Sequence, residues 1–75
     1  MMYTRKYLLD LFKIRNTCFA QYGYSGAFAV YEIMNKLNIP LEQHKNYIDT
    51  LLDLGEIELL KSSLNKKLYK IVDKD

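Results

Sequence analysis

Apolar residues recur every three or four positions through the first 22 residues of the chain. This spacing places them on one face of a helix, so it predicts a helix over about residues 3–22. Arg15 interrupts the stripe. Gly23 offers a stop, because glycine accepts a positive φ at little cost. The apolar residues that the pattern assigns to the helix face are Tyr7, Leu8, Leu11, Phe12, Cys18 and Phe19.

A short loop with two glycines follows, and a second helix is predicted over about residues 26–37. Ser25 is the expected N-cap, because its hydroxyl can accept a hydrogen bond from the first helical turn. Phe28, Tyr31 and Asn35 are expected on a face other than the buried one. The residues expected on the buried face are Val30, Ile33, Met34 and Leu37.

Residues 37–40 break the helical pattern and predict a tight turn. Asn38 tolerates the left-handed conformation that such a turn needs. Ile39 is expected to fill the core between the flanking helices. Pro40 suits the first turn of the next helix, where its missing N–H is not required.

The third helix is predicted over about residues 40–54, and Gly55 is its stop. The residues expected to face inward are Ile48, Leu51 and Leu52, with His44 or Tyr47 continuing the stripe. The residues left largely outside are Gln43, Lys45, Asn46, Asp49 and Thr50.

Two short runs of strand-like residues close the chain, at residues 56–60 and 68–72. Their near-alternation of apolar and polar side chains predicts two antiparallel strands. They are joined by residues 61–67, the hairpin tip, in which Asn65 favours a turn. The predicted fold is therefore mainly α with a small β-hairpin (α+β), in a single domain over residues 1–75.

The segment from Leu37 to Leu60 resembles winged helix-turn-helix transcription regulators in its spacing. The resemblance covers about the last 45 residues. The residues that carry it are Leu37 at the end of the second helix, Ile39 in the turn, the core pair Ile48 and Leu51, the helix end at Leu54-Gly55, and Ile57 opening the strand. It implies three helices and a wing of two or three antiparallel strands, the third supplied by the connection between the first two helices.

The resemblance also implies double-stranded DNA as a partner and transcription regulation, as a repressor, as the function. The third helix would read the major groove and the hairpin tip would touch phosphates or a minor groove. Gln43 and Asn46 can pair with adenine, and Lys45 with guanine or a phosphate. Arg5, Lys6 and Arg15 would add backbone contacts. The implied DNA-binding residues are Leu41, Glu42, Gln43, Lys45, Asn46, Asp49, Lys61, Ser62, Ser63, Asn65, Lys66 and Lys67.

Charge departs from the family pattern on the third helix. The formal net charge is +2, but residues 37–60 carry one lysine against five acidic residues, and both ends of the chain are positive. The third helix has no arginine, and phosphate neutralisation supplies most non-specific DNA affinity. This favours a second interpretation, in which the acidic helix docks on a basic protein partner, as a viral or plasmid modulator of host machinery would.

Ten aromatic residues are more than a core of 75 residues readily buries. Tyrosine and phenylalanine are enriched at protein interfaces, so we expect a homodimer built on the first helix and the aromatic cluster after it. A two-fold dimer would set two third helices one DNA turn apart. The residues assigned to this interface are Tyr7, Phe19, Tyr22, Tyr24, Phe28 and Tyr31.

Other chemistry finds little support in the sequence. Cys18 is the only cysteine, so the chain can form no intrachain disulfide, and a reducing cytoplasmic location is expected. His44 is the only histidine, and a metal site needs several ligands. No nucleophile motif or phosphate-binding loop is present. We therefore expect no enzyme activity, cofactor, metal, membrane segment or small-molecule ligand.

Overall fold

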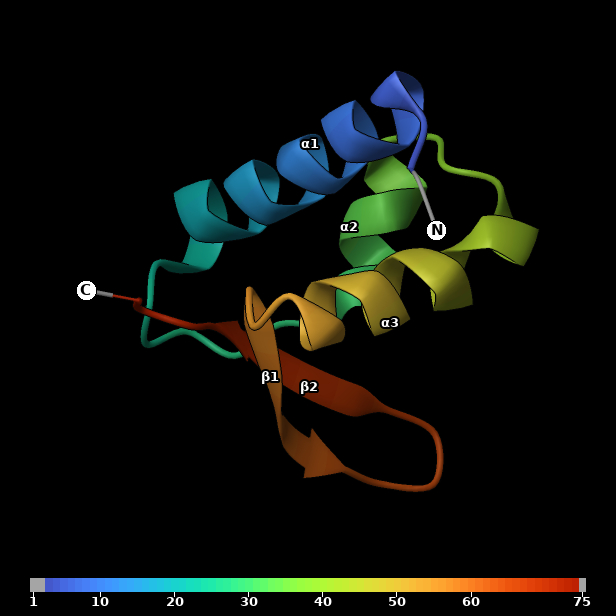
Figure 1. The fold of residues 1–75 in the computed structure, drawn as a ribbon. Coiled ribbons are helices and arrows are strands. Elements are labelled where there is room, and N and C mark those ends of the chain that lie inside the picture. The colour runs from blue at the N-terminus through green and yellow to red at the C-terminus, as the bar shows by residue number, and fades with distance from the viewer. Residues whose placement is uncertain (1–2, 75) are drawn as a thin grey trace.

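A computed structural model describes residues 3–74 of the chain. The elements are α1 (Arg5–Tyr22), α2 (Val30–Lys36), a 3₁₀ turn η1 (Leu41–Gln43) that runs into α3 (His44–Asp53), β1 (Ile57–Ser62) and β2 (Lys67–Ile71). The three helices pack together, and the antiparallel β1–β2 hairpin projects from them (Figure 1). The predicted α+β class is confirmed. No helix within residues 3–74 is both long enough and apolar enough to cross a bilayer.

Helix α1 begins and ends close to the predicted positions. The Thr4 hydroxyl caps it by accepting from the Tyr7 N–H at 3.1 Å, and Gly23 ends it with φ 65°. Leu11, Ile14 and Cys18 are buried, whereas Leu8, Phe12 and Phe19, which fit the same helical period, are exposed. The helix carries two neighbouring apolar stripes, and the core takes only one of them.

Helix α2 begins four residues later than predicted, and Ser25 does not cap it. Ala29 is the N-cap, and it makes no side-chain hydrogen bond there. The reason is Phe28, which is extended and exchanges backbone hydrogen bonds of 2.9 and 2.8 Å with Tyr69 on β2. Phe28 is 2% exposed and its ring stacks on Tyr22, so the expectation that it faces away from the core was wrong. This bridge adds a one-residue third strand to the hairpin.

The turn between α2 and α3 is as predicted. Asn38 has φ 58°, and Ile39 is buried between the helices. The Ile39 carbonyl lies 2.8 Å from Nε2 of His44, a buried residue at the start of α3. Since a carbonyl can only accept, Nε2 of His44 is the donor in this hydrogen bond.

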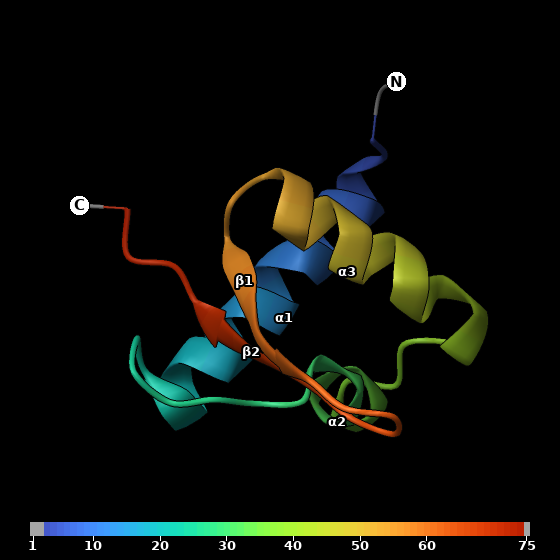
Figure 2. The ribbon, with the colours of Figure 1, turned by 90° about the horizontal axis from the view of Figure 1, so that it is seen from below.

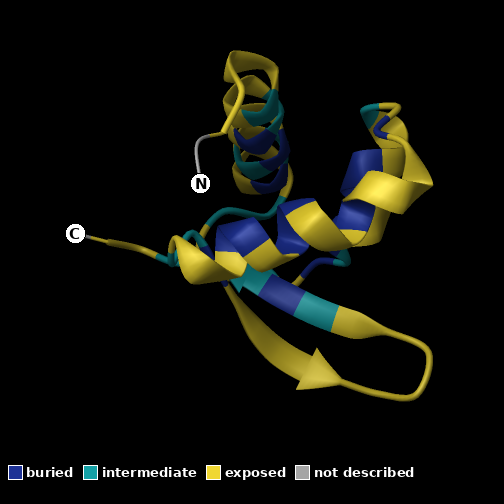
Figure 3. Cartoon of the chain, turned by 45° about the vertical axis from the view of Figure 1, so that its right-hand side comes forward, coloured by how far each residue is buried: buried dark blue, intermediate teal, exposed yellow. Residues whose placement is uncertain are grey.

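Helix α3 buries His44, Tyr47, Ile48 and Leu51, but two predictions at its far end were wrong. Leu52 is exposed, and Thr50 is buried. The Thr50 hydroxyl lies 2.7 Å from the Tyr7 hydroxyl and donates to the Asn46 carbonyl at 2.9 Å. This long-range polar contact accounts for the inward position of Thr50. Leu52 then lies outside the buried face of α3. Figure 3 shows the division of α3 into a buried and an exposed face.

The hairpin pairs Ile57 with Ile71 and Ser62 with Lys67, and its register shifts between Leu59 and Lys61. Ile57, Tyr69 and Ile71 fill the core, whereas the rest of β1 is exposed. Seen from below, the hairpin extends past α2 (Figure 2). Strand β1 has no partner on its other side among the described residues, and the register shift blunts this open edge.

A side chain at Gly55 would meet no steric clash, but the backbone conformation there is unfavourable for any other residue. Its φ is +71°, and a Cβ added there would meet no atom within 4 Å. We expect Gly55→Ala to lower the free energy of unfolding by about 1–2 kcal/mol, the usual cost of a left-handed non-glycine residue. Urea denaturation measures this. Asn38→Gly, which relieves a left-handed residue, should not lower the urea midpoint, and an unchanged midpoint for Gly55→Ala would contradict the argument.

Cys18 is buried on the inner face of α1. Burial raises the pKa of its thiol to about 12, because the charged thiolate is poorly solvated there. The thiol therefore stays protonated, and it serves as a small apolar core residue.

Candidate nucleic-acid interface

The outer face of η1 and α3 is open to solvent. All six residues predicted to read DNA from this helix are exposed: Leu41, Glu42, Gln43, Lys45, Asn46 and Asp49. The opposite face of the helix is fixed by His44, Tyr47, Ile48 and Leu51, which lie in the core. The sequence therefore located this face correctly, although exposure alone does not assign it a ligand.

Among the described residues, Lys45 is the only cation on the outer face of η1 and α3, and it is already paired. Its Nζ lies 2.8 Å from an Asp49 carboxylate oxygen one turn later. This hydrogen bond is the main cause that raises the pKa of Lys45. Glu42 and Asp53 form no ion pair within the described residues, so the face keeps an excess of negative charge.

The hairpin tip carries the opposite charge. Its loop is closed by Ser63, whose N–H and hydroxyl both donate to the Lys66 carbonyl, at 2.9 and 3.0 Å. Lys66 is 3.9 Å from Glu32 on α2, whereas Lys61 and Lys67 have no ion pair in residues 3–74. The predicted tip residues Lys61, Ser62, Ser63, Asn65, Lys66 and Lys67 are all exposed.

Leu64 is a tip residue that the sequence analysis passed over. It is 102% exposed, the highest value of any exposed large apolar residue in the described chain. A large apolar side chain at the end of a hairpin, between polar neighbours, was the signal available in the sequence. Such a side chain can act as a wedge in a minor groove.

Tyr31 joins the two parts of the candidate interface. Its ring centroid lies 5.6 Å from that of His44 at the start of α3. Tyr31 also lines, with the tip residues from Ser63 to Lys67, a groove of about 590 Å³ between α2 and the hairpin. The sequence analysis assigned Tyr31 to a dimer interface, but the structure places it between α3 and the hairpin tip.

The predicted α1 cations separate into two groups. Lys6 pairs with Asp10 at 3.0 Å and lines a groove with Gln43 and Asn46, so it borders the outer face of α3. Arg15 does not, because its Nε is held 2.6 Å from Glu56 at the opposite end of α3. The expected backbone contact by Arg15 is therefore not supported by its position.

Glu56 forms ion pairs with two cations, Arg15 and Lys74, and these predict how the stability of the fold depends on pH. The hydrogen bond from Lys74 lowers the pKa of Glu56 most, burial opposes it, and Arg15 adds to the lowering. Because the folded pKa lies below that of the unfolded chain, the stabilisation is complete above about pH 4.5 and is lost as pH falls through the folded value. Glu56→Gln should flatten this acid-side loss, measured as urea midpoints between pH 6 and pH 2.

Lys74→Met is the matched variant for that measurement. It keeps the Glu56 carboxylate but removes the hydrogen bond that lowers the pKa of Glu56 most. It should therefore flatten the same part of the curve, to a smaller extent than Glu56→Gln. A Gln variant that loses stability as steeply as the wild type would contradict the assignment.

The six aromatic residues predicted for a dimer interface lie at separate places. Tyr7 stacks between Tyr3 and Tyr47 near the start of α1. Phe19 meets Tyr24 edge to face near the end of α1, roughly 18 Å along the helix from Tyr7. Phe28 lies in the core with the half-buried Tyr22 stacked on it, and Tyr31 lies near α3. These residues do not form the single surface that was expected.

His44 and Cys18 belong to different elements, and both serve the core. Nδ1 of His44 is buried and has no hydrogen-bond partner in the described structure. Across residues 3–74, no three side chains of the His, Cys, Asp and Glu types converge as a metal site would require.

Comparison with known proteins identifies no relative. No family model matches the chain, no curated protein matches its sequence, and no solved structure matches its fold. The features described above therefore carry the functional argument by themselves.

Proposed function

We propose that this protein is a small DNA-binding transcription regulator that represses by occupying its target. In this proposal η1 and α3 lie in the major groove of double-stranded DNA, and the hairpin tip lies against the backbone or an adjacent minor groove. The order of three helices and an antiparallel hairpin is consistent with a winged helix-turn-helix.

The observation that carries the proposal is the position of Tyr31 beside both α3 and the hairpin tip. Its ring lies 5.6 Å from that of His44 at the start of α3, and it lines a groove with the tip residues from Ser63 to Lys67. An α-helix about 10–12 Å across fits the major groove, which is about 12 Å wide. A cationic loop beside that helix then meets phosphates, which position the protein without reading sequence.

Each part of the surface has a distinct role in this proposal. Gln43 and Asn46 pair with adenine edges, and Lys45 reaches guanine or a phosphate once it exchanges Asp49 for DNA. Lys61 and Lys67 have no ion pair to break within the described residues, so they are the lysines freest to neutralise phosphates. Lys6, beside Gln43 and Asn46, adds a contact from α1.

Selection of preferred duplexes from a random pool, followed by binding measurements over a salt series, tests the proposal. We expect one sequence to be preferred, and log K to fall with log salt with a slope of about −3 if three or four lysines meet phosphates. Affinity that does not change with salt, together with no preferred sequence, would overturn the proposal.

Leu64 gives a prediction that separates its role from that of the lysines. Leu64→Ser should weaken binding several-fold, because a wedge that unstacks a base step is lost. It should leave the salt slope unchanged, since no charge is removed. Fluorescence anisotropy at three salt concentrations measures both quantities. A change of slope by about one unit would show that Leu64→Ser acts through the neighbouring lysines instead.

A second candidate function is supported by the charges of α3. Lys45 is neutralised by Asp49, and Glu42 and Asp53 are unpaired within residues 3–74, so the outer face suits a basic protein partner. Asp49→Lys with Asp53→Lys separates the two proposals. DNA affinity should rise if the face meets phosphates, and function should be lost if the face meets a basic protein.

A further inference from the structure

Helix α1 carries an apolar stripe that the core does not use. Leu8, Phe12 and Phe19 lie on one side of the helix, four and seven residues apart, which is the spacing of one helical face. Phe12 is 66% exposed, and Leu8 and Phe19 are also open to solvent. A large aromatic side chain this exposed, at the centre of an apolar stripe, leaves most of its apolar surface in water in the monomer.

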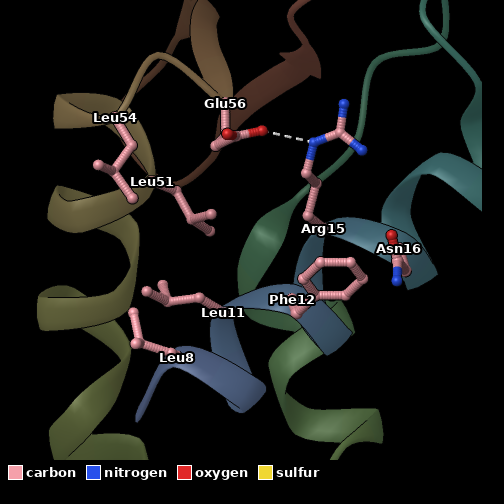
Figure 4. A pocket seen from close by; sticks show the side chains of 8 residues that line it. All are labelled: Leu8, Leu11, Phe12, Arg15, Asn16, Leu51, Leu54 and Glu56. Carbon is pink, nitrogen blue, oxygen red and sulfur yellow. Dashed lines mark hydrogen bonds and ion pairs between the residues drawn. The ribbon is translucent and has the colours of Figure 1, made fainter. Parts of the chain in front are cut away.

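A groove lies directly beside this stripe. It has a volume of about 380 Å³ and lies between α1 and the end of α3. Figure 4 shows Leu8, Leu11 and Phe12 from α1 on one side, Leu51 from α3 and Leu54 just after it on the other, and Arg15 with Glu56 at one end. We call this the α1–α3 groove. Phe12 stands at its rim, so one surface holds both a projecting aromatic ring and an apolar hollow.

The charges around the α1–α3 groove define what can enter it. Arg15 and Glu56 are the only charged residues that line it in the described structure, and they bind each other at 2.6 Å. The Arg15 guanidinium also lies 6.0 Å from the Phe19 ring centre. No unpaired charge is left to attract an acidic or basic peptide, so an uncharged apolar group suits the groove. A second Phe12 side chain has this character.

The available area approaches that of a dimer of ordinary size. A standard interface buries about 800 Å² of each partner, or about 15% of the 5406 Å² surface of this chain. Helix α1 has 18 residues and is about 27 Å long. Helix α3 has 10 residues and is about 15 Å long, so the two helices side by side project to roughly 400 Å², and the accessible area is larger because side chains roughen it.

We propose that two copies of this chain form a two-fold dimer through the α1–α3 groove, each placing Phe12 in the groove of the other. A two-fold interface requires one patch that complements itself, and a projecting ring beside an apolar hollow meets this requirement. This dimer differs from the interface expected from the aromatic cluster. It also does not rest on the proposed DNA binding, since the groove and the hairpin tip are formed by different residues.

Sedimentation equilibrium of the full chain without DNA, from about 1 to 500 µM, tests the dimer. The wild type should change from the 8.9 kDa monomer to twice that mass as concentration rises. Phe12→Glu should raise the dimer Kd about a hundredfold or more, because each dimer loses two central anchors. The substituted side chain stays solvated in the monomer, and circular dichroism verifies that the fold is retained.

Two further variants make the result specific to this groove. Leu64→Glu also introduces a glutamate in place of an exposed apolar residue, but at the hairpin tip. It should therefore leave the dimer Kd within about twofold of the wild-type value. Leu54→Lys should weaken the dimer as Phe12→Glu does, and the two changes in one chain should restore part of the affinity by pairing Glu with Lys across the interface. A wild type that stays monomeric, a Phe12→Glu dimer as tight as the wild type, or a double variant weaker than both singles would overturn the proposal.

Discussion

Replacing Lys66 and Lys67 together by glutamate is expected to lower DNA affinity about a hundredfold or more at physiological salt. Hydrogen bonds to charged groups contribute about 1.5–3 kcal/mol each, and two such contacts are lost. The salt slope should also fall by about 1.8 units, because two fewer counterions are released. Both residues are exposed, so the fold should be retained. Anisotropy titrations on the selected duplex measure both quantities.

A matched pair of single variants controls for net charge. Lys67→Glu and Lys13→Glu change the charge of the chain by the same amount, but Lys13 lies on α1, whereas Lys67 begins β2 beside the hairpin tip. Only Lys67→Glu should lower DNA affinity by about tenfold, while Lys13→Glu should have a small effect that salt screens. Equal losses for the two variants would show that overall charge, and not the hairpin tip, governs binding.

Phe28→Ala is expected to remove a large share of the stability of the protein. A buried phenylalanine reduced to alanine costs about 3–5 kcal/mol, and a domain of 75 residues has a total stability of roughly 4–11 kcal/mol. Phe28 stacks on Tyr22 at 5.4 Å next to its backbone bridge to Tyr69, so the cavity left by alanine would lie between α1 and β2. Thermal denaturation followed by circular dichroism measures the loss.

Tyr24 supplies the control for Phe28, because it is an aromatic residue four positions earlier that is exposed. Tyr24→Ala should cost less than about 1 kcal/mol, the value of its edge-to-face contact with Phe19. Phe28→Leu, which keeps most of the apolar volume, should fall between the two variants. Similar losses for Tyr24→Ala and Phe28→Ala would contradict the burial of Phe28.

The features that the sequence predicted well depend on local chemistry. Asn38 and Gly55 adopt the left-handed conformations that their residue types favour, so the turn and the end of α3 were readable from neighbouring residues. The exposed face of α3 followed from its periodicity. These are properties of a few consecutive residues, and a pattern along the chain records them directly.

The features that the sequence missed depend on partners far along the chain. Phe28 reads as part of a helix until Tyr69, 41 residues later, pairs with its backbone. Thr50 reads as a surface residue until the Tyr7 hydroxyl approaches it. Leu8 and Phe12 fit a helical stripe as well as Leu11 does, so periodicity could not tell which stripe the core would take. Burial is decided by packing between elements, which a single sequence does not contain.

The buried thiol of Cys18 can be used as a probe of how often this small domain opens. A maleimide dye reacts with a thiol that is both exposed and ionised. The Cys18 thiol is buried and protonated while α1 lies on the core. The labelling rate under native conditions therefore counts how often that helix lifts away. Ligand that clamps the helices together would slow the dye reaction, so a binding partner can be recognised before its identity is known.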